Sequence, residues 1–316
     1  MQEDFSELKI FAGSASPKLA AEVAKILGVP VSKAKIGKFA DGENFVDILE
    51  SVRGKDIFLI QSTSTPVNAN YMQLFLMLDA LKRASSHKLN AIVPYYGYSR
   101  QDRLVGRSPL SASLIAHFLQ EAGAQSFMSV DLHTATIQGF FDIPTDNLSP
   151  TSLFAEYFKK KGISGEGVVV VSPDVGGVKR ARNLARKLDA GLAVIDKHRP
   201  KPNQSEVGHV VGEVEGKIAV LCDDIVDTGG SLANAAEALK AKGATKVYAA
   251  VTHGVLSASA QQKISSCNAL EELAVTNSIE HSTLQPKITQ VSLAPAIAEA
   301  IKCIYFHKSL SETLDL

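Results

Sequence analysis

The chain has 316 residues, enough for two domains, and its 45% hydrophobic and 21% charged residues are typical of a soluble globular protein. Lys plus Arg and Asp plus Glu both number 33, so no overall field favours nucleic acid or a membrane, and an anionic substrate needs a local cluster of cations. No apolar run reaches the roughly 20 residues of a membrane-spanning helix, and the N-terminus has no signal-peptide pattern. The three separated cysteines exclude a disulfide framework, so a reduced, cytoplasmic protein is expected.

Apolar strands alternate with helices along the first half of the chain. Strands are predicted at Leu8–Phe11, Asp56–Gln61, Asn90–Pro94 and Ser126–Val130. Helices are predicted at Pro17–Leu27, Asn70–Ala84 and Ser111–Ala122. This alternation is typical of a parallel sheet whose two faces are covered by helices.

The second half repeats the scheme. Strands are predicted at Val168–Val171, Ala193–Ile195, Ile218–Leu221 and Lys246–Val251, and helices at Lys179–Leu188 and Ser231–Lys242. A weak internal repeat relates Leu119–Ala124 to Leu239–Ala244, since each leads into a buried strand. We therefore expect two related α/β domains, 1–149 and 150–316, each a mostly parallel sheet flanked by helices. The last helix, about Pro295–Ile304, can pack against either half, including the N-terminal domain.

The segment Val220–Ser231 is the most informative part of the sequence. A buried strand is followed by two carboxylates and then by a short loop that leads into a helix, whose unpaired N–H groups favour phosphate. Asp223 and Asp224 would repel a phosphate, so they need sugar hydroxyls or a magnesium ion as partners. The alternative is an acidic turn with Ser231 as helix cap. The candidate sugar-phosphate residues are Asp223, Asp224, Asp227, Thr228, Gly229, Gly230 and Ser231.

Asp223–Ser231 resembles the phosphoribosyl diphosphate loop shared by type I phosphoribosyltransferases and ribose-phosphate pyrophosphokinases. Further segments resemble motifs of the second family: Phe39–Glu43, Pro94–Arg103, Asp131–Pro144, Ser172–Gly177 and Asp196–Pro200. This resemblance implies two type I phosphoribosyltransferase-like domains. It also implies transfer of the β,γ-pyrophosphoryl group of Mg-ATP to the C1 hydroxyl of ribose 5-phosphate, giving 5-phosphoribosyl 1-diphosphate and AMP.

The resemblance also implies roles for individual residues. Lys197 and Arg199 become the catalytic cations that act on the transferring phosphoryl group. The implied ATP-binding residues are Phe39, Asp41, Gly42, Glu43, Arg100 and Gln101. The implied ligands of magnesium (Mg2+) are His133, Asp131 and Asp174. His253, at the equivalent point of the repeat, is interpreted as structural.

Family members of this kind form dimers that assemble into hexamers, which implies a cytoplasmic homohexamer. Four sequence features depart from the family pattern. Leu104–Ser108 is short and weakly basic, and His198 replaces a residue that is usually basic. Gly229-Gly230-Ser231 replaces the more typical Ala-Gly-Thr, and Asn277-Ser278 replaces Asp-Thr. Two other functions stay open. A phosphoribosyltransferase would not need Phe39–Glu43 or Lys197, and a catalytically silent regulatory homologue would be expected to lose charged site residues.

Overall fold

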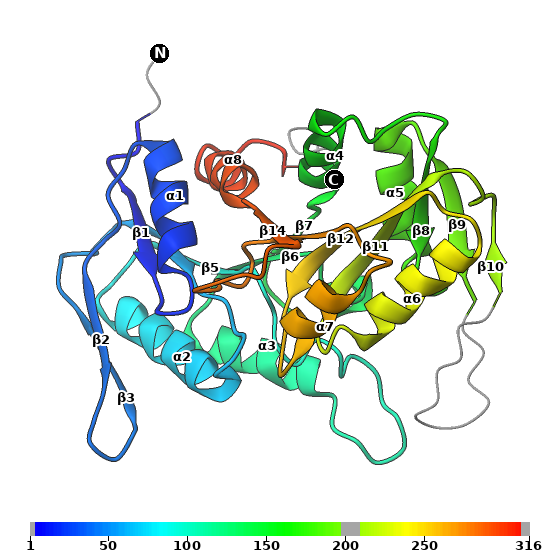
Figure 1. Cartoon of the computed structure of the whole chain (residues 1–316). Helices are drawn as coiled ribbons and strands as arrows, with labels where there is room; N and C mark the ends of the chain where they lie inside the picture. The colour runs from blue at the N-terminus through cyan, green and yellow to red at the C-terminus, as the bar shows by residue number, and fades with distance from the viewer. Residues whose placement is uncertain (1–3, 197–208, 311–316) are drawn as a thin grey trace. The chain divides into compact units, whose positions relative to one another are not determined.

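The computed structural model describes residues 4–196 and 209–310, and the chain forms two compact units. Unit 1 holds Met1–Ser149, Ser278–Glu280 and Leu293–Leu316, and unit 2 holds Pro150–Asn277 and His281–Ser292. The chain therefore returns to unit 1 at its C-terminal end. The final helix, α8 (Ala294–Tyr305), belongs to unit 1, where it packs against α1 (Pro17–Leu27) (Figure 1).

Unit 1 is built on a five-stranded sheet in which every neighbouring pair is parallel. Its strands, in spatial order, are β1 (Leu8–Ala12), β4 (Asp56–Ile60), β5 (Lys88–Val93), β6 (Ser126–Val130) and β7 (Thr145–Leu148). Helices α2 (Val67–Arg83) and α3 (Ser111–Ala122), with the short 3-10 helix η1 (Ala135–Phe140), share one apolar core with these strands. A separate antiparallel hairpin joins β2 (Ala34–Lys38) to β3 (Asn44–Ile48).

Unit 2 contains a seven-stranded sheet that is parallel except at one edge, where β10 is antiparallel to β9. Its strands, in spatial order, are β10 (Val210–Val211), β9 (Gly191–Ile195), β8 (Val168–Ser172), β11 (Ile218–Val226), β12 (Lys246–Gly254), β13 (Glu272–Thr276) and β14 (Ile288–Val291). Strand β8 has five buried residues in succession, as expected of a strand covered on both faces.

Helices cover both faces of the unit 2 sheet. One apolar core contains residues of α4 (Thr151–Lys160) and α5 (Val178–Leu188), and another contains residues of α6 (Gly230–Ala241) and α7 (Ala260–Ser266). The two cores draw on alternate residues of the strands, such as Val170 for the first and Val171 for the second. The predicted α/β class, with parallel sheets flanked by helices, is confirmed.

Strand β11 differs from its predicted bounds. The sequence predicts a strand that stops at Leu221, but β11 continues to Val226 because its backbone pairs with β12 as far as Gly254. The carboxylates of Asp223 and Asp224 therefore belong to the strand itself. Among the described residues, no helix has both the length and the apolar character to cross a membrane.

Candidate active site

Two adjacent carboxyl groups lie near the end of β11, between its neighbours β8 and β12 in unit 2. The backbone N–H of Asp224 donates a 2.9 Å hydrogen bond to Oδ1 of Asp223. From α5, Nη1 of Arg180 lies 3.8 Å from Oδ1 of Asp224, and both side chains are largely buried. Ionisation of both carboxyl groups would place two negative charges side by side, with the Arg180 guanidinium acting in their favour.

Burial and the closeness of the two groups raise the pKa of one of them, that of Asp223. Burial, and then the neighbouring Asp224 carboxylate, raise the pKa of Asp223 to about 8, while Arg180 acts in the opposite direction. Burial disfavours a charged carboxylate, and a second negative charge nearby adds to that effect. A ligand that brings hydroxyl donors or a cation would favour the ionised carboxylates and so lower this pKa, and perturbed pKa values of this kind are typical of binding sites.

The loop that follows β11 prepares the start of α6 for an anion. Ser257, in the loop after β12, anchors this loop with two hydrogen bonds. Its hydroxyl donates a 2.5 Å hydrogen bond to Oδ1 of Asp227, and its N–H donates to the Asp227 carbonyl at 3.0 Å. Gly229 then turns the chain with φ of 76°, and α6 begins at Gly230. The first N–H groups of a helix have no partner within it and lie at its positive end, which suits phosphate.

The left-handed turn at position 229 is expected to require glycine. An alanine at this position would have to keep the left-handed backbone conformation. Its methyl group would lie 3.3 Å from the Ala260 carbonyl oxygen and from a side-chain carbon of Ile264, both in α7. We expect Gly229→Ala to lower the free energy of unfolding by about 1–2 kcal/mol, because side chains disfavour this conformation. Urea denaturation measures the change.

Gly230→Ala is the matched control, because a methyl group there would meet nothing within 4 Å. Alanine also favours the helical conformation over glycine by about 0.5–1 kcal/mol, so this variant is expected to be as stable as the wild type or more so. Equal destabilisation by the two substitutions would show that the left-handed turn is not what requires glycine at position 229.

A cleft of about 960 Å³ lies in unit 1, between the start of α2 and the loop after β5. Arg100 and Gln101 of that loop line it, and the facing wall is Pro66–Ala69. The Tyr98 hydroxyl donates a 2.5 Å hydrogen bond to Oδ1 of Asn68, so the two walls are joined across the cleft. The volume is within the usual range for small-molecule sites, and the arginine supplies donors suited to phosphate.

The tip of the β2–β3 hairpin carries the other residues expected to bind ATP. It is a tight turn in which the N–H of Phe39 donates to the Glu43 carbonyl at 2.8 Å. The Phe39 ring is 58% exposed, with one face near Phe45 at a centroid distance of 5.2 Å. Within unit 1, none of the residues Phe39, Asp41, Gly42 and Glu43 lines the cleft that contains Arg100. The structure thus brings Arg100 and Gln101 together but leaves the hairpin tip outside their cleft.

The candidate metal ligands fall into two groups. Asp131 and His133 follow β6 in unit 1, and Asp174 follows β8 in unit 2, where its Oδ1 accepts a 2.9 Å hydrogen bond from the Gly177 N–H at the start of α5. The part of the chain that the structure describes has no group of three His, Cys, Asp or Glu residues placed to hold a metal. Magnesium commonly uses only one or two carboxylates together with substrate phosphates and water, and carboxylate is the ligand type that it prefers, so the assignment of these residues to magnesium stays a prediction.

Two family models match the chain. One, described as the N-terminal domain of ribose phosphate pyrophosphokinase, matches residues 8–123, and the other, a phosphoribosyl synthetase-associated domain, matches residues 199–314. Over 311 residues, and 98% of each chain, the sequence is 50% identical to the ribose-phosphate pyrophosphokinase of Bacillus caldolyticus. The chain belongs to the ribose-phosphate pyrophosphokinase family.

Other members of the family agree with this assignment. The enzyme of the same name from Clostridium tetani is 48% identical over 318 residues, covering 100% of this chain and 99% of its own. The crystal structure of phosphoribosylpyrophosphate synthetase from Mycobacterium smegmatis matches with a TM-score of 0.88 and 42% identity, covering 96% of this chain and all of that one. The resemblance inferred from the sequence motifs is confirmed.

Three interactions near the family motifs were not predicted from the sequence. Arg180 lies beside Asp224, and Ser257 holds the loop at Asp227. In unit 1, Oγ1 of Thr134 donates a 2.5 Å hydrogen bond to Oδ2 of Asp102, which ties the Arg100 loop to the segment after β6. Arg180 and Ser257 lie outside the quoted motifs, so no sequence signal singles them out. Thr134 and Asp102 belong to two of those motifs, but the sequence does not show that they contact each other. The predicted catalytic residues Lys197 and Arg199 lie outside the described residues.

Proposed function

We propose that this chain is a ribose-phosphate pyrophosphokinase that transfers the β,γ-pyrophosphoryl group of Mg-ATP to the C1 hydroxyl of ribose 5-phosphate. The observation that carries the proposal is the arrangement in unit 2, where Asp223 and Asp224 precede the left-handed turn at Gly229 and the free N–H groups at the start of α6. Acceptors for sugar hydroxyls next to an anion-binding helix start suit a sugar phosphate.

In this proposal unit 2 binds the ribose 5-phosphate. The backbone N–H groups at Gly230 and Ser231, with the hydroxyl of Thr228, donate to the 5-phosphate. The carboxylates of Asp223 and Asp224 accept hydrogen bonds from ribose hydroxyls. Asp227, already bonded to Ser257, holds the loop that presents these donors. Orienting the sugar in this way would keep its C1 hydroxyl in one position, which lowers the entropic part of the barrier.

Unit 1 is assigned to ATP. Arg100 offers a planar set of donors to the phosphate chain. The Oε1 atom of Gln101 accepts a hydrogen bond from the Ser111 hydroxyl, which directs its amide donors to other partners. Phe39 presents an exposed ring for stacking on adenine. Asp41 and Glu43 of the same turn are assigned to the adenine amino group, and Gly42 gives the turn its left-handed conformation, with φ of 95°.

The reaction has one bond-forming and one bond-breaking event. The C1 oxygen bonds to the β-phosphorus of ATP, its proton is released, and the bond from the β-phosphorus to the α-phosphate oxygen breaks so that AMP leaves. Negative charge grows on the phosphoryl oxygens, and Lys197 and Arg199 are assigned to stabilise it. Asp131, His133 and Asp174 would hold magnesium, which when bound neutralises phosphate charge.

Self-association and location follow as parts of the same proposal. We assign ATP and ribose 5-phosphate as the small-molecule partners and expect the chain to form dimers and hexamers in the cytoplasm, without nucleic acid or membrane. The tip of the β2–β3 hairpin lies outside the cleft of its own chain. In an assembly, the nucleotide-binding residues at this tip could act together with the cleft of another chain.

The test is to incubate the protein with magnesium, ATP and ribose 5-phosphate and to separate the nucleotide products. AMP is expected, formed in equal amount with the sugar diphosphate. ADP alone would identify a kinase of another kind and would contradict the proposal. No product under conditions in which a bacterial relative is active would instead indicate the catalytically silent homologue. Assays with and without inorganic phosphate report whether that ion activates the enzyme.

A further inference from the structure

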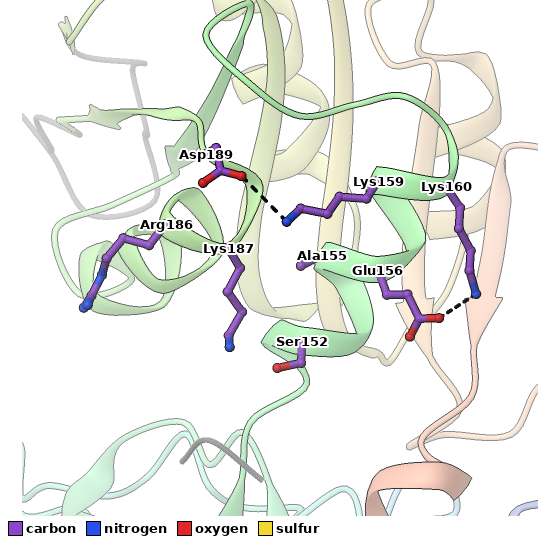
Figure 2. A pocket seen from close by; sticks show the side chains of 8 residues that line it. All are labelled: Ser152, Ala155, Glu156, Lys159, Lys160, Arg186, Lys187 and Asp189. Carbon is purple, nitrogen blue, oxygen red and sulfur yellow. Dashed lines mark ion pairs between the residues drawn. The ribbon is translucent and has the colours of Figure 1, made fainter.

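A second hollow of about 700 Å³ lies in unit 2, between helices α4 and α5 (Figure 2). Four cationic side chains line it, with two carboxylates and the hydroxyl of Ser152 near the start of α4. The cations are Lys159, Lys160, Arg186 and Lys187. The chain as a whole has equal numbers of positive and negative side chains, so this excess of positive charge is local.

The two carboxylates of the hollow pair with two of its four cations. Lys160 contacts Glu156 at 2.6 Å, one helical turn away, and Lys159 reaches across from α4 to Asp189 at 3.7 Å. All four side chains are 48–79% exposed, and such surface pairs contribute only about 0–1 kcal/mol, so an incoming anion can recruit these lysines at little cost. Arg186 donates to the neutral amide oxygen of Asn183 at 3.4 Å, a bond that does not cancel its charge.

Helix stability alone does not account for this arrangement. Cations in the last turn of a helix interact favourably with its dipole, which explains why α4 and α5 each end in a basic pair. Because α4 and α5 pack side by side in one apolar core, both pairs line one hollow, where like charges repel. Figure 2 shows Lys187 extending into the space between the helices, beside the small side chain of Ala155. An open hollow lined by several cations suits a compact anion.

We propose that the α4–α5 hollow binds a small, multiply charged phosphate ligand at a site distinct from the sugar-phosphate loop. Arg180, near the start of α5, lies beside Asp224, whereas Lys187 is seven residues further on, about 10 Å along the helix axis. The hollow has the size of a small-molecule site. A nucleic acid would instead need an extended basic strip, whereas the cations of this hollow are few and stand among two carboxylates.

Calorimetric titration of the full-length protein at low ionic strength tests the proposal with three probes: inorganic phosphate, inorganic triphosphate and AMP. At least one probe is expected to show a binding event that Arg186→Gln/Lys187→Gln weakens about tenfold or more, because the variant removes two of the four cations that line the hollow and low ionic strength screens their charge only weakly. The probe that responds distinguishes free phosphate from a nucleotide as the source of the anion. Hydrogen exchange is expected to slow in the last turns of α4 and α5.

The control is Lys242→Gln/Lys246→Gln, which removes two exposed lysines of unit 2 that do not line the hollow. It is expected to leave the affinity of that binding event unchanged, and melting temperatures verify that both variants fold. Binding at the substrate sites is common to all three proteins and turnover is not measured, so the outcome does not depend on the proposed activity. Equal affinities of wild type and Arg186→Gln/Lys187→Gln for all three probes, or weakening by both double variants alike, would overturn the proposal.

Discussion

Lys197→Ala is expected to lower kcat by about 10²–10³-fold or more, since loss of a single donor to a transition-state anion typically costs that much. The lysine is assigned to the transferring phosphoryl group, where negative charge grows as the β-phosphorus changes partners. Removing a fixed cation there raises the barrier but removes no part of either apolar core. AMP formation at saturating substrate measures the effect, and the melting temperature is expected to stay at the wild-type value.

Lys201→Ala is the matched control, because Lys201 belongs to the same basic segment but has no assigned role in the site. It is expected to retain near-normal turnover. If Lys197→Ala also retained near-normal turnover, the catalytic role assigned to Lys197 would be wrong. The family membership of the chain would not be affected, because it rests on sequence identity. If both variants lost activity equally, the charge of the whole segment, and not one directed lysine, would be what the reaction needs.

Asp223→Asn is expected to gain stability relative to the wild type as the pH rises from about 4 to about 8. The folded protein holds the Asp223 proton far more tightly than the usual Asp pKa of 3.8 allows, so the folded state binds more protons than the unfolded state over this range. The stability from that protonation is complete below the unfolded pKa and is lost as the pH rises through the folded pKa. The loss is on the order of a few kcal/mol, since each pKa unit corresponds to about 1.36 kcal/mol.

Urea denaturation of both proteins across this pH range, without ligands, measures the difference. Asparagine cannot ionise and its amide can donate to Asp224, so the variant lacks this source of pH dependence. Asp189→Asn is the control, because it makes the same chemical change at a side chain of unit 2 that is 79% exposed. Parallel pH profiles for wild type and Asp223→Asn would mean that Asp223 is ionised in the folded protein at neutral pH.

Much of the fold could be predicted because its central strands are rich in apolar residues. The runs at β4, β5, β6 and β8 are buried on both faces, and a parallel sheet needs that pattern. Several of the elements that the sequence did not predict are short or partly exposed. The hairpin strands β2 and β3 have no buried residues, and β7 has one, so their sequences carry no clear period. Aspartate is disfavoured in strands, and tertiary pairing with β12 overrides that preference in β11.

The candidate site divides in a similar way. Contiguous motifs allowed Asp223–Ser231 and Arg100–Gln101 to be predicted, because their residues are neighbours in the chain and share one loop or strand end. Arg180 and Ser257 could not be predicted, since they reach the site from α5 and from the loop after β12. The roles of the motif residues in binding ATP, ribose 5-phosphate and metal stay predictions.

By itself the sequence determined the α/β class, the order of the main elements and the family. These depend on hydrophobic period and contiguous motifs, which are local properties of the chain. The tertiary structure alone decided that α8 belongs to unit 1, that burial and Asp224 raise the pKa of Asp223, and that the basic ends of α4 and α5 share one hollow. Each of these depends on distance through space between residues far apart in sequence, and on the water that packing removes.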